Sequence, residues 1–70
     1  MQSLLFNTTE KTIKLYEGPA PKGTIIAEFD DIPTVKTLDN YYEVMGKDES
    51  GRALPILRLP ITNTNMYIKK

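Results

Sequence analysis

The sequence predicts an all-β protein, a small antiparallel barrel of five or six short strands formed by residues 1–70 as a single domain. The β-branched and aromatic residues fall in short runs that alternate with polar residues, which is the period of a half-buried strand. Gly, Pro, Asn and Asp separate these runs at regular spacing, as turns do in small barrels. No stretch shows the spacing of apolar residues that is typical of a helix.

Composition restricts the classes of function. With no cysteine and no histidine, the chain offers neither disulfides nor the usual zinc ligands, so we expect no metal and no cofactor. Nine basic and nine acidic residues give a formal net charge of zero, and the basic residues do not cluster, which disfavours nucleic-acid binding. The N-terminal residues lack both a basic segment and a long apolar run, so we expect no signal peptide, no membrane span and a cytoplasmic location.

The first candidate strand is SLLF, residues 3–6, within an N-terminal segment, residues 1–11, that is either an extension or an extra strand. The second is KTIKLYE, residues 11–17, whose alternation gives it one buried face. GPAPKG, residues 18–23, predicts a stiff loop, because proline fixes φ and glycine allows positive φ. Such a loop either spaces two strands or recognises a ligand.

The third candidate strand, TIIAEF, ends at the turn DDIP, residues 30–33. Residues 34–47 form one long bent strand or two strands with the bend at Asp39-Asn40. The turn at residues 48–51 is polar and contains a glycine, which predicts a hairpin. If Lys47 pairs with Arg52 in that hairpin, Tyr42 falls near Leu57 and Glu43 near Ile56.

Proline interrupts the strand that follows this turn. Pro55 cannot donate a ladder hydrogen bond, so we expect an edge position or a β-bulge there. The last segment, residues 61–70, predicts a polar turn, with a single 3₁₀ turn as one form of it, and a short closing strand. The inward parity of all strands together predicts a core of Ile13, Leu15, Ile25, Ala27, Phe29, Val35, Tyr42, Val44, Leu57, Met66 and Ile68.

The order of these signals resembles that of bacterial SH3-like (SH3b-type) barrel domains over residues 12–68. IKLYEGPAP is similar to the strand and Gly-Pro turn that open the family, and GTIIAEF takes the place of its second strand. NYYEVM matches its aromatic strand, ESGRALPIL its distal hairpin, and TNTNMYI its closing helical turn and strand. Tyr41 stands where the family usually has Trp. The resemblance implies a barrel that binds peptides, cell-wall glycans or proteins without catalysis, in a bacterium or a bacteriophage.

Aromatic side chains are the candidate binding residues. Parity leaves Tyr16, Tyr41 and Tyr67 able to face outward, either as a shared ligand face or as a solvated rim. Met45 shares the face of Tyr41, and the pair forms an apolar patch if it is exposed. Arg58 is expected near Tyr41 across the ladder, for stacking, for an acidic partner or as a solvated charge.

Catalysis is disfavoured. Asp30, Asp31 and Asp39 could hold a cation or act as a paired acid and base, but turn-forming aspartates are commoner. No serine has a histidine partner and no cysteine nucleophile exists, so we expect no enzyme.

Three classes of function remain open. The leading hypothesis is a protein-interaction module that binds a protein partner, for example a phage-type inhibitor of a host protein. The others are a cell-wall or peptide-binding domain and a small oligomeric scaffold that binds a minor ligand between subunits. SLLF and the strand after the hairpin carry apolar residues on both strand faces. An unpaired edge beside such a surface favours pairing with another chain, so we predict a homo-oligomer. Its contact is expected at Leu4, Leu5 and Phe6 or along Leu54–Ile61, including Ile56.

Overall fold

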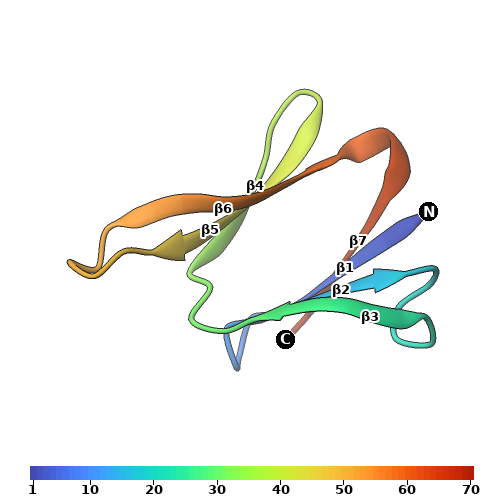
Figure 1. Cartoon of the computed structure of the whole chain (residues 1–70), viewed down its shortest axis with the longest axis horizontal. Coiled ribbons are helices and arrows are strands. Elements are labelled where there is room, and N and C mark those ends of the chain that lie inside the picture. The colour runs from blue at the N-terminus through green and yellow to red at the C-terminus, as the bar shows by residue number, and fades with distance from the viewer.

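The computed structural model describes all 70 residues and contains seven β-strands and one 3₁₀ turn. The strands are β1 (Gln2–Asn7), β2 (Thr12–Glu17), β3 (Thr24–Phe29), β4 (Thr34–Thr37), β5 (Tyr41–Lys47), β6 (Ala53–Pro60) and β7 (Thr64–Lys69), and the 3₁₀ turn η1 (Ile61–Asn63) precedes β7. They form a four-stranded sheet of order β3-β2-β1-β7 and a three-stranded sheet of order β4-β5-β6 (Figure 1).

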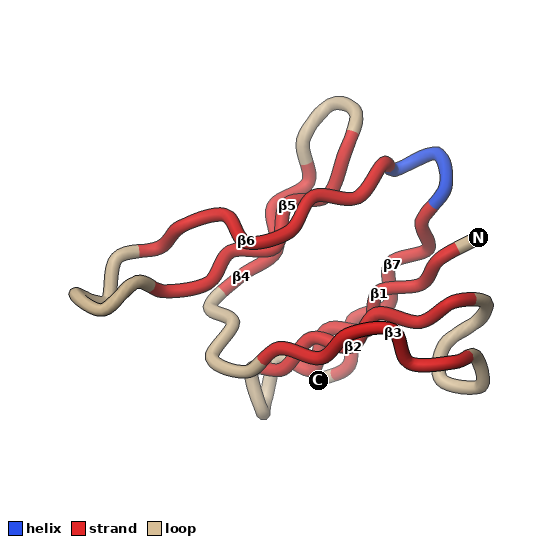
Figure 2. Tube along the Cα trace, viewed as in Figure 1, coloured by secondary structure: helices blue, strands red, loops and turns tan.

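The all-β class is therefore confirmed, whereas the expectation of five or six strands in a closed barrel is not met. There are seven strands in two separate sheets. The chain passes between the sheets only from edge strand to edge strand, through residues 30–33 and through η1 (Figure 2). The sheets face each other without hydrogen bonding at their edges, so four edges stay open. No helix here has the length and apolar character that crossing a membrane requires.

The N-terminal strand β1 lies in the middle of the four-stranded sheet, antiparallel to β2 and parallel to β7. The parallel pairing joins residues more than sixty positions apart in the sequence, for example Leu4 with Met66. Two cross-strand rows of apolar residues cover the inner face of this sheet: Ala27, Leu15, Leu4 and Met66, and Phe29, Ile13, Phe6 and Ile68.

Two hairpins form the three-stranded sheet. Residues 34–47 divide into β4 and β5, and the bend falls at Asp39-Asn40, one of the two predicted alternatives. The β-bulge expected near Pro55 is present: Met45 pairs with Pro55 and Val44 with Leu57, so Ile56 is the extra residue.

The predicted register of the β5–β6 hairpin is wrong. Lys47 pairs with Ala53, because the hydrogen bond from the Asp48 N–H to the Arg52 carbonyl (2.9 Å) closes the turn one residue later. The bulge adds another residue to the offset, and Tyr42 consequently lies opposite Leu59 instead of Leu57.

The core between the sheets is small. Seven residues form it: Leu4, Phe6, Ile13, Leu15, Ile32, Val44 and Leu59. Of the predicted core residues, Ile13, Leu15 and Val44 are buried, and Ala27, Phe29, Val35, Tyr42, Leu57 and Met66 pack partly buried against the cluster. The predictions for Ile25 and Ile68 are wrong, since these side chains are 48% and 63% exposed. The β2–β3 register shifts between Leu15 and Tyr16, so Ile25 pairs with Tyr16 and shares its outer face. Ile68 lies near the end of the edge strand β7, where one lateral neighbour is missing.

Candidate interaction surface

Arg58 and Tyr41 meet on the outer face of the β5–β6 hairpin, as predicted, but diagonally, since Arg58 pairs with Glu43 and Tyr41 with Pro60. The Arg58 guanidinium carbon lies 5.2 Å from the centroid of the Tyr41 ring, within the range of a cation–π contact. Arg58 Nε also donates to Glu43 Oε2 at 2.8 Å, and Glu43 is its direct neighbour in the ladder. The Glu43 side chain is only 10% exposed whereas that of Arg58 is 61% exposed. Two contacts thus hold the guanidinium while its terminal nitrogens remain without a partner.

Two predicted surface residues are buried. Met45 is 5% exposed and Tyr16 is 3% exposed, so the expectation that they face solvent is wrong. Both lie on central strands: Met45 lies between Thr34 and Pro55, and Tyr16 lies between Ser3 and Ile25. Neighbours on both sides cover a central-strand side chain even on the outer face of a sheet.

The remaining predicted binding residue lies on the other sheet. Tyr67 is 43% exposed and belongs to the edge strand β7 of the four-stranded sheet, where it pairs with Leu5. Tyr41 and Arg58 belong to the three-stranded sheet. The structure therefore brings Tyr41 and Arg58 together, and it does not bring Tyr16, Met45 and Tyr67 to the same surface.

The two predicted self-association segments differ in exposure. Leu4 and Phe6 are buried in the core, and Leu5 is half-buried on the opposite face of β1. In contrast, Leu54 and Ile56 of β6 are 36% and 39% exposed, and only Leu59 of that strand is buried. Contacts through Leu4 or Phe6 would require the core to open, so of the two predicted segments β6 is the one that exposes more apolar side chains to a partner.

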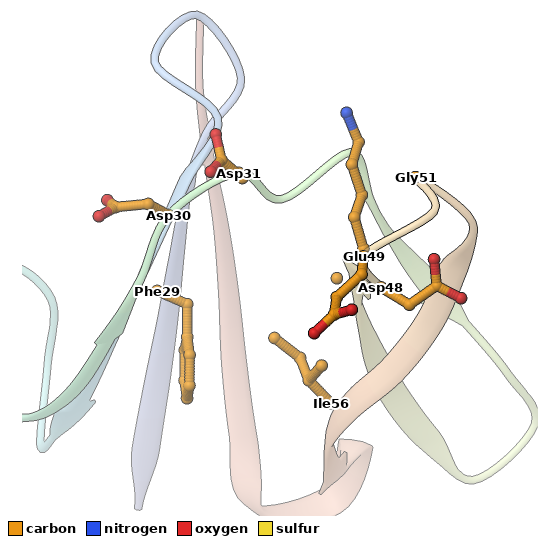
Figure 3. Close-up of a pocket in the computed structure, with 9 residues that line it drawn as sticks. Phe29, Asp30, Asp31, Asp48, Glu49, Gly51 and Ile56 are labelled. Carbon is orange, nitrogen blue, oxygen red and sulfur yellow. The ribbon is translucent and has the colours of Figure 1, made fainter.

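An open cleft of about 540 Å³ lies where the hairpin end of the three-stranded sheet diverges from the other sheet. Figure 3 shows Phe29 and Ile56 on its opposite walls. Ile56 lies over Gly46, where an added Cβ would come within 2.9 Å of Ile56 Cγ2, so this glycine leaves the room that Ile56 occupies. The bulge and Gly46 together direct an exposed isoleucine into the cleft.

The cleft also brings together two acidic pairs that the sequence analysis did not connect. They are Asp30-Asp31 in the β3–β4 connection and Asp48-Glu49 in the hairpin turn. In the sequence, the only feature that these pairs share is that both lie in predicted turns. Whether the two turns lie close together depends on how the two sheets pack. The Asp30 carboxylate points away from the opposite wall (Figure 3), so the four carboxylates do not converge.

Asp48 organises the hairpin turn. Its Oδ1 accepts hydrogen bonds from the Ser50 hydroxyl at 2.7 Å and from the Ser50 and Arg52 backbone N–H groups, both at 2.9 Å. The Ser50 hydroxyl and then the Arg52 N–H stabilise the charged form and lower the pKa of Asp48 below its ordinary value of 3.8. Gly51, at φ 85°, takes the left-handed position of the turn. The Asp48 carboxylate therefore stabilises the turn.

No group of three or more acidic side chains in the chain is placed to hold a metal ion.

The predicted stiff loop, residues 18–23, closes through the Gly23 N–H, which donates to the Pro19 carbonyl at 2.6 Å. A Cβ on Gly23 would lie 2.2 Å from the Glu17 carbonyl oxygen, so the tight fold of the loop requires glycine.

Comparison of the chain with protein-family models, with curated proteins and with solved structures found no match.

Proposed function

We propose that this chain is a non-enzymatic protein-interaction module that acts in the cytoplasm of a bacterium and binds a protein partner through the free end of the β5–β6 hairpin. One observation carries the proposal: six of the eight residues of β6 are exposed, and they include Leu54 and Ile56. A small chain with a core of seven residues would gain by burying these side chains within itself. The fold instead leaves both exposed, and Ile56 lines the open cleft against Gly46.

The form of this surface suits a protein partner. Ile56 and Phe29 supply apolar walls, and the charged turn residues form a polar rim around them, which is the usual anatomy of a protein–protein contact. The resemblance of residues 12–68 to bacterial SH3-like domains, whose members bind through aromatics and loops, supports the same class of function. A phage- or bacterium-encoded inhibitor of a host protein is one concrete form of the proposal.

The test compares two matched isoleucines. Ile56→Lys charges the hairpin surface, and Ile25→Lys makes the same change at a similarly exposed position on the four-stranded sheet. The wild-type chain and both variants are immobilised and exposed to bacterial lysate and, separately, to purified peptidoglycan. Thermal melts first confirm that each variant is folded.

We expect one stoichiometric protein to be retained by the wild type and by Ile25→Lys, and lost with Ile56→Lys. Retention of peptidoglycan without a protein would instead favour a cell-wall-binding domain. Equal retention of the protein by all three chains would refute the hairpin as the binding surface.

A further inference from the structure

The direction of the backbone groups along β6 follows from the two ends of its ladder with β5. The Asp48 N–H donates to the Arg52 carbonyl at 2.9 Å, and the Ile61 N–H donates to the Asn40 carbonyl at 3.1 Å. Because hydrogen-bonded and non-hydrogen-bonded pairs alternate in an antiparallel ladder, the Glu43–Arg58 pair is a non-hydrogen-bonded one. The N–H and C=O of Arg58 therefore point away from β5, toward the open edge.

The same alternation places Ala53, Pro55 and Pro60 at the other outward positions of this edge. Two of these four residues are prolines, which offer a carbonyl but no N–H. Pairing β6 with β6 of a second copy would set Arg58 against Arg58, or set Arg58 and Ala53 against prolines. The first arrangement opposes like charges, and the second lacks half of its donors. A symmetric β6–β6 contact is therefore disfavoured.

A complementary edge exists on the other sheet. The Gly18 N–H donates to the Met1 carbonyl at 2.8 Å, which sets the alternation of the β1–β2 ladder and directs the backbone groups of Lys14 toward β1. Its partner in β3 is Glu28, so the N–H and C=O of Glu28 point to the open edge of β3. Glu28 is exposed, and the only ion pair in the chain is the one between Arg58 and Glu43.

We infer that the chain self-associates head to tail, with β6 of one copy pairing antiparallel to β3 of a second copy and with Arg58 opposite Glu28. The Arg58 guanidinium has a hydrogen bond only from Nε. Its terminal nitrogens then face the Glu28 carboxylate, which forms no ion pair within its own chain. The same register sets Leu57 opposite Phe29 and Leu59 opposite Ala27. All four of these side chains pack toward the core of their own copy, so apolar meets apolar.

The geometry makes this contact an open one. The chain connects β3 to β4 and β6 to β7, so the β3 and β6 edges lie on opposite sides of the two facing sheets (Figure 1). One contact between two copies therefore leaves one β3 edge and one β6 edge unpaired. A contact between two different surfaces that does not close produces chains of copies. This inference goes beyond the proposed function, because it uses the backbone edges of β6 around Arg58 and of β3 around Glu28; the two surfaces share Phe29, which lines the hairpin cleft.

Sedimentation of the purified chain from micromolar to millimolar concentration tests the inference. We expect the average mass to rise above 8.0 kDa with concentration, to pass the dimer without a plateau, and to fall again as salt screens the ion pair. Glu28→Arg should weaken association at least about tenfold, because it replaces opposite charges by like charges across the strands. Arg52→Glu, at the other arginine of the chain, should leave association unchanged.

Mixing experiments decide the head-to-tail arrangement. Glu28→Arg keeps an intact β6 edge, so an excess of this variant should shorten wild-type assemblies by capping them at one end. An equimolar mixture of Glu28→Arg and Arg58→Glu should associate although neither variant does so alone. If Arg58→Glu does not fold beside the buried Glu43, the capping experiment decides without it.

Three results would overturn the inference: a wild-type chain that stays at 8.0 kDa throughout, a Glu28→Arg chain that associates like the wild type, or a dimer that does not depend on residue 28. Capture of a foreign protein is a separate readout. It should be lost with Ile56→Lys and kept with Glu28→Arg, so failure of one proposal is distinguishable from failure of the other.

Discussion

Two buried hydroxyls near the start of β1 and β7 should respond differently to removal. Ser3 is fully buried, and its Oγ donates to the Gly18 carbonyl at 2.6 Å. Thr64 is 5% exposed, and its Oγ1 has no hydrogen-bond partner. Thr64 pairs with Gln2, the neighbour of Ser3, so the two sites share one region of the four-stranded sheet. The two side chains lie on opposite faces of the sheet, and the pair compares a satisfied with an unsatisfied buried hydroxyl in one region of it.

Ser3→Ala removes the donor that ties the start of β1 to the β2–β3 loop, and we expect it to lower the free energy of unfolding by about 1–2 kcal/mol. For a domain of this size that corresponds to a fall in Tm of roughly 4–8 °C per kcal/mol. Thr64→Val removes a desolvated hydroxyl without a partner and replaces it by a methyl group. We expect no loss, or a gain of up to about 1 kcal/mol.

Urea and thermal unfolding followed by circular dichroism measure both changes, provided that different probes give coincident transitions. The reasoning fails if Ser3→Ala leaves the midpoint unchanged, or if Thr64→Val destabilises the chain as much as Ser3→Ala does.

Three further predictions concern the core, the loop and the turn. Ile32→Ala empties a fully buried position between the sheets and should cost about 2–5 kcal/mol in urea melts, whereas Ile25→Ala at an exposed site should cost far less. Gly23→Ala should unfold or strongly destabilise the chain, since its Cβ would lie 2.2 Å from the Glu17 carbonyl oxygen; a melt close to that of the wild type would show that the loop can move. The Asp48 pKa is lowered by folding, so its carboxylate stabilises the fold above the ordinary value of 3.8 and loses this effect as the pH falls through the folded pKa. The stability difference between wild type and Asp48→Asn should accordingly be constant near neutral pH and shrink in acid, and a difference that grows in acid would contradict the assignment.

Local sequence signals predicted much of the fold. The alternation of apolar and polar residues predicted β2 and β3, and the polar turn at 48–51 predicted the β5–β6 hairpin. Pro55 predicted the bulge. Each of these features depends on residues that are close in the sequence. The parallel pairing of β1 with β7 joins the two ends of the chain and has no local signal. The division into two sheets was missed as well.

The candidate site was predicted in part. Parity assigns a side chain to a face of a sheet, but it does not say whether the strand is central or at an edge. Tyr16 and Met45 were expected at the surface and are covered because β2 and β5 have neighbours on both sides. Ile32, in the predicted turn DDIP, belongs to the core because its N–H bonds the Lys11 carbonyl and holds the connection between the sheets. The proximity of Tyr41 and Arg58 was predicted correctly although the register was wrong, because the two side chains also meet diagonally across the hairpin.

Residue-resolved amide exchange at low and high protein concentration tests most directly the claim that the open edge of β6 is a contact surface. In dilute solution the Arg58 and Glu28 amides should exchange rapidly, while the Leu57 and Leu59 amides, which point into the β5–β6 ladder, stay protected. At high concentration Arg58 and Glu28 should become protected together. An Arg58 amide that is already protected in dilute solution, or one that stays unprotected when the chain is concentrated, would contradict the account.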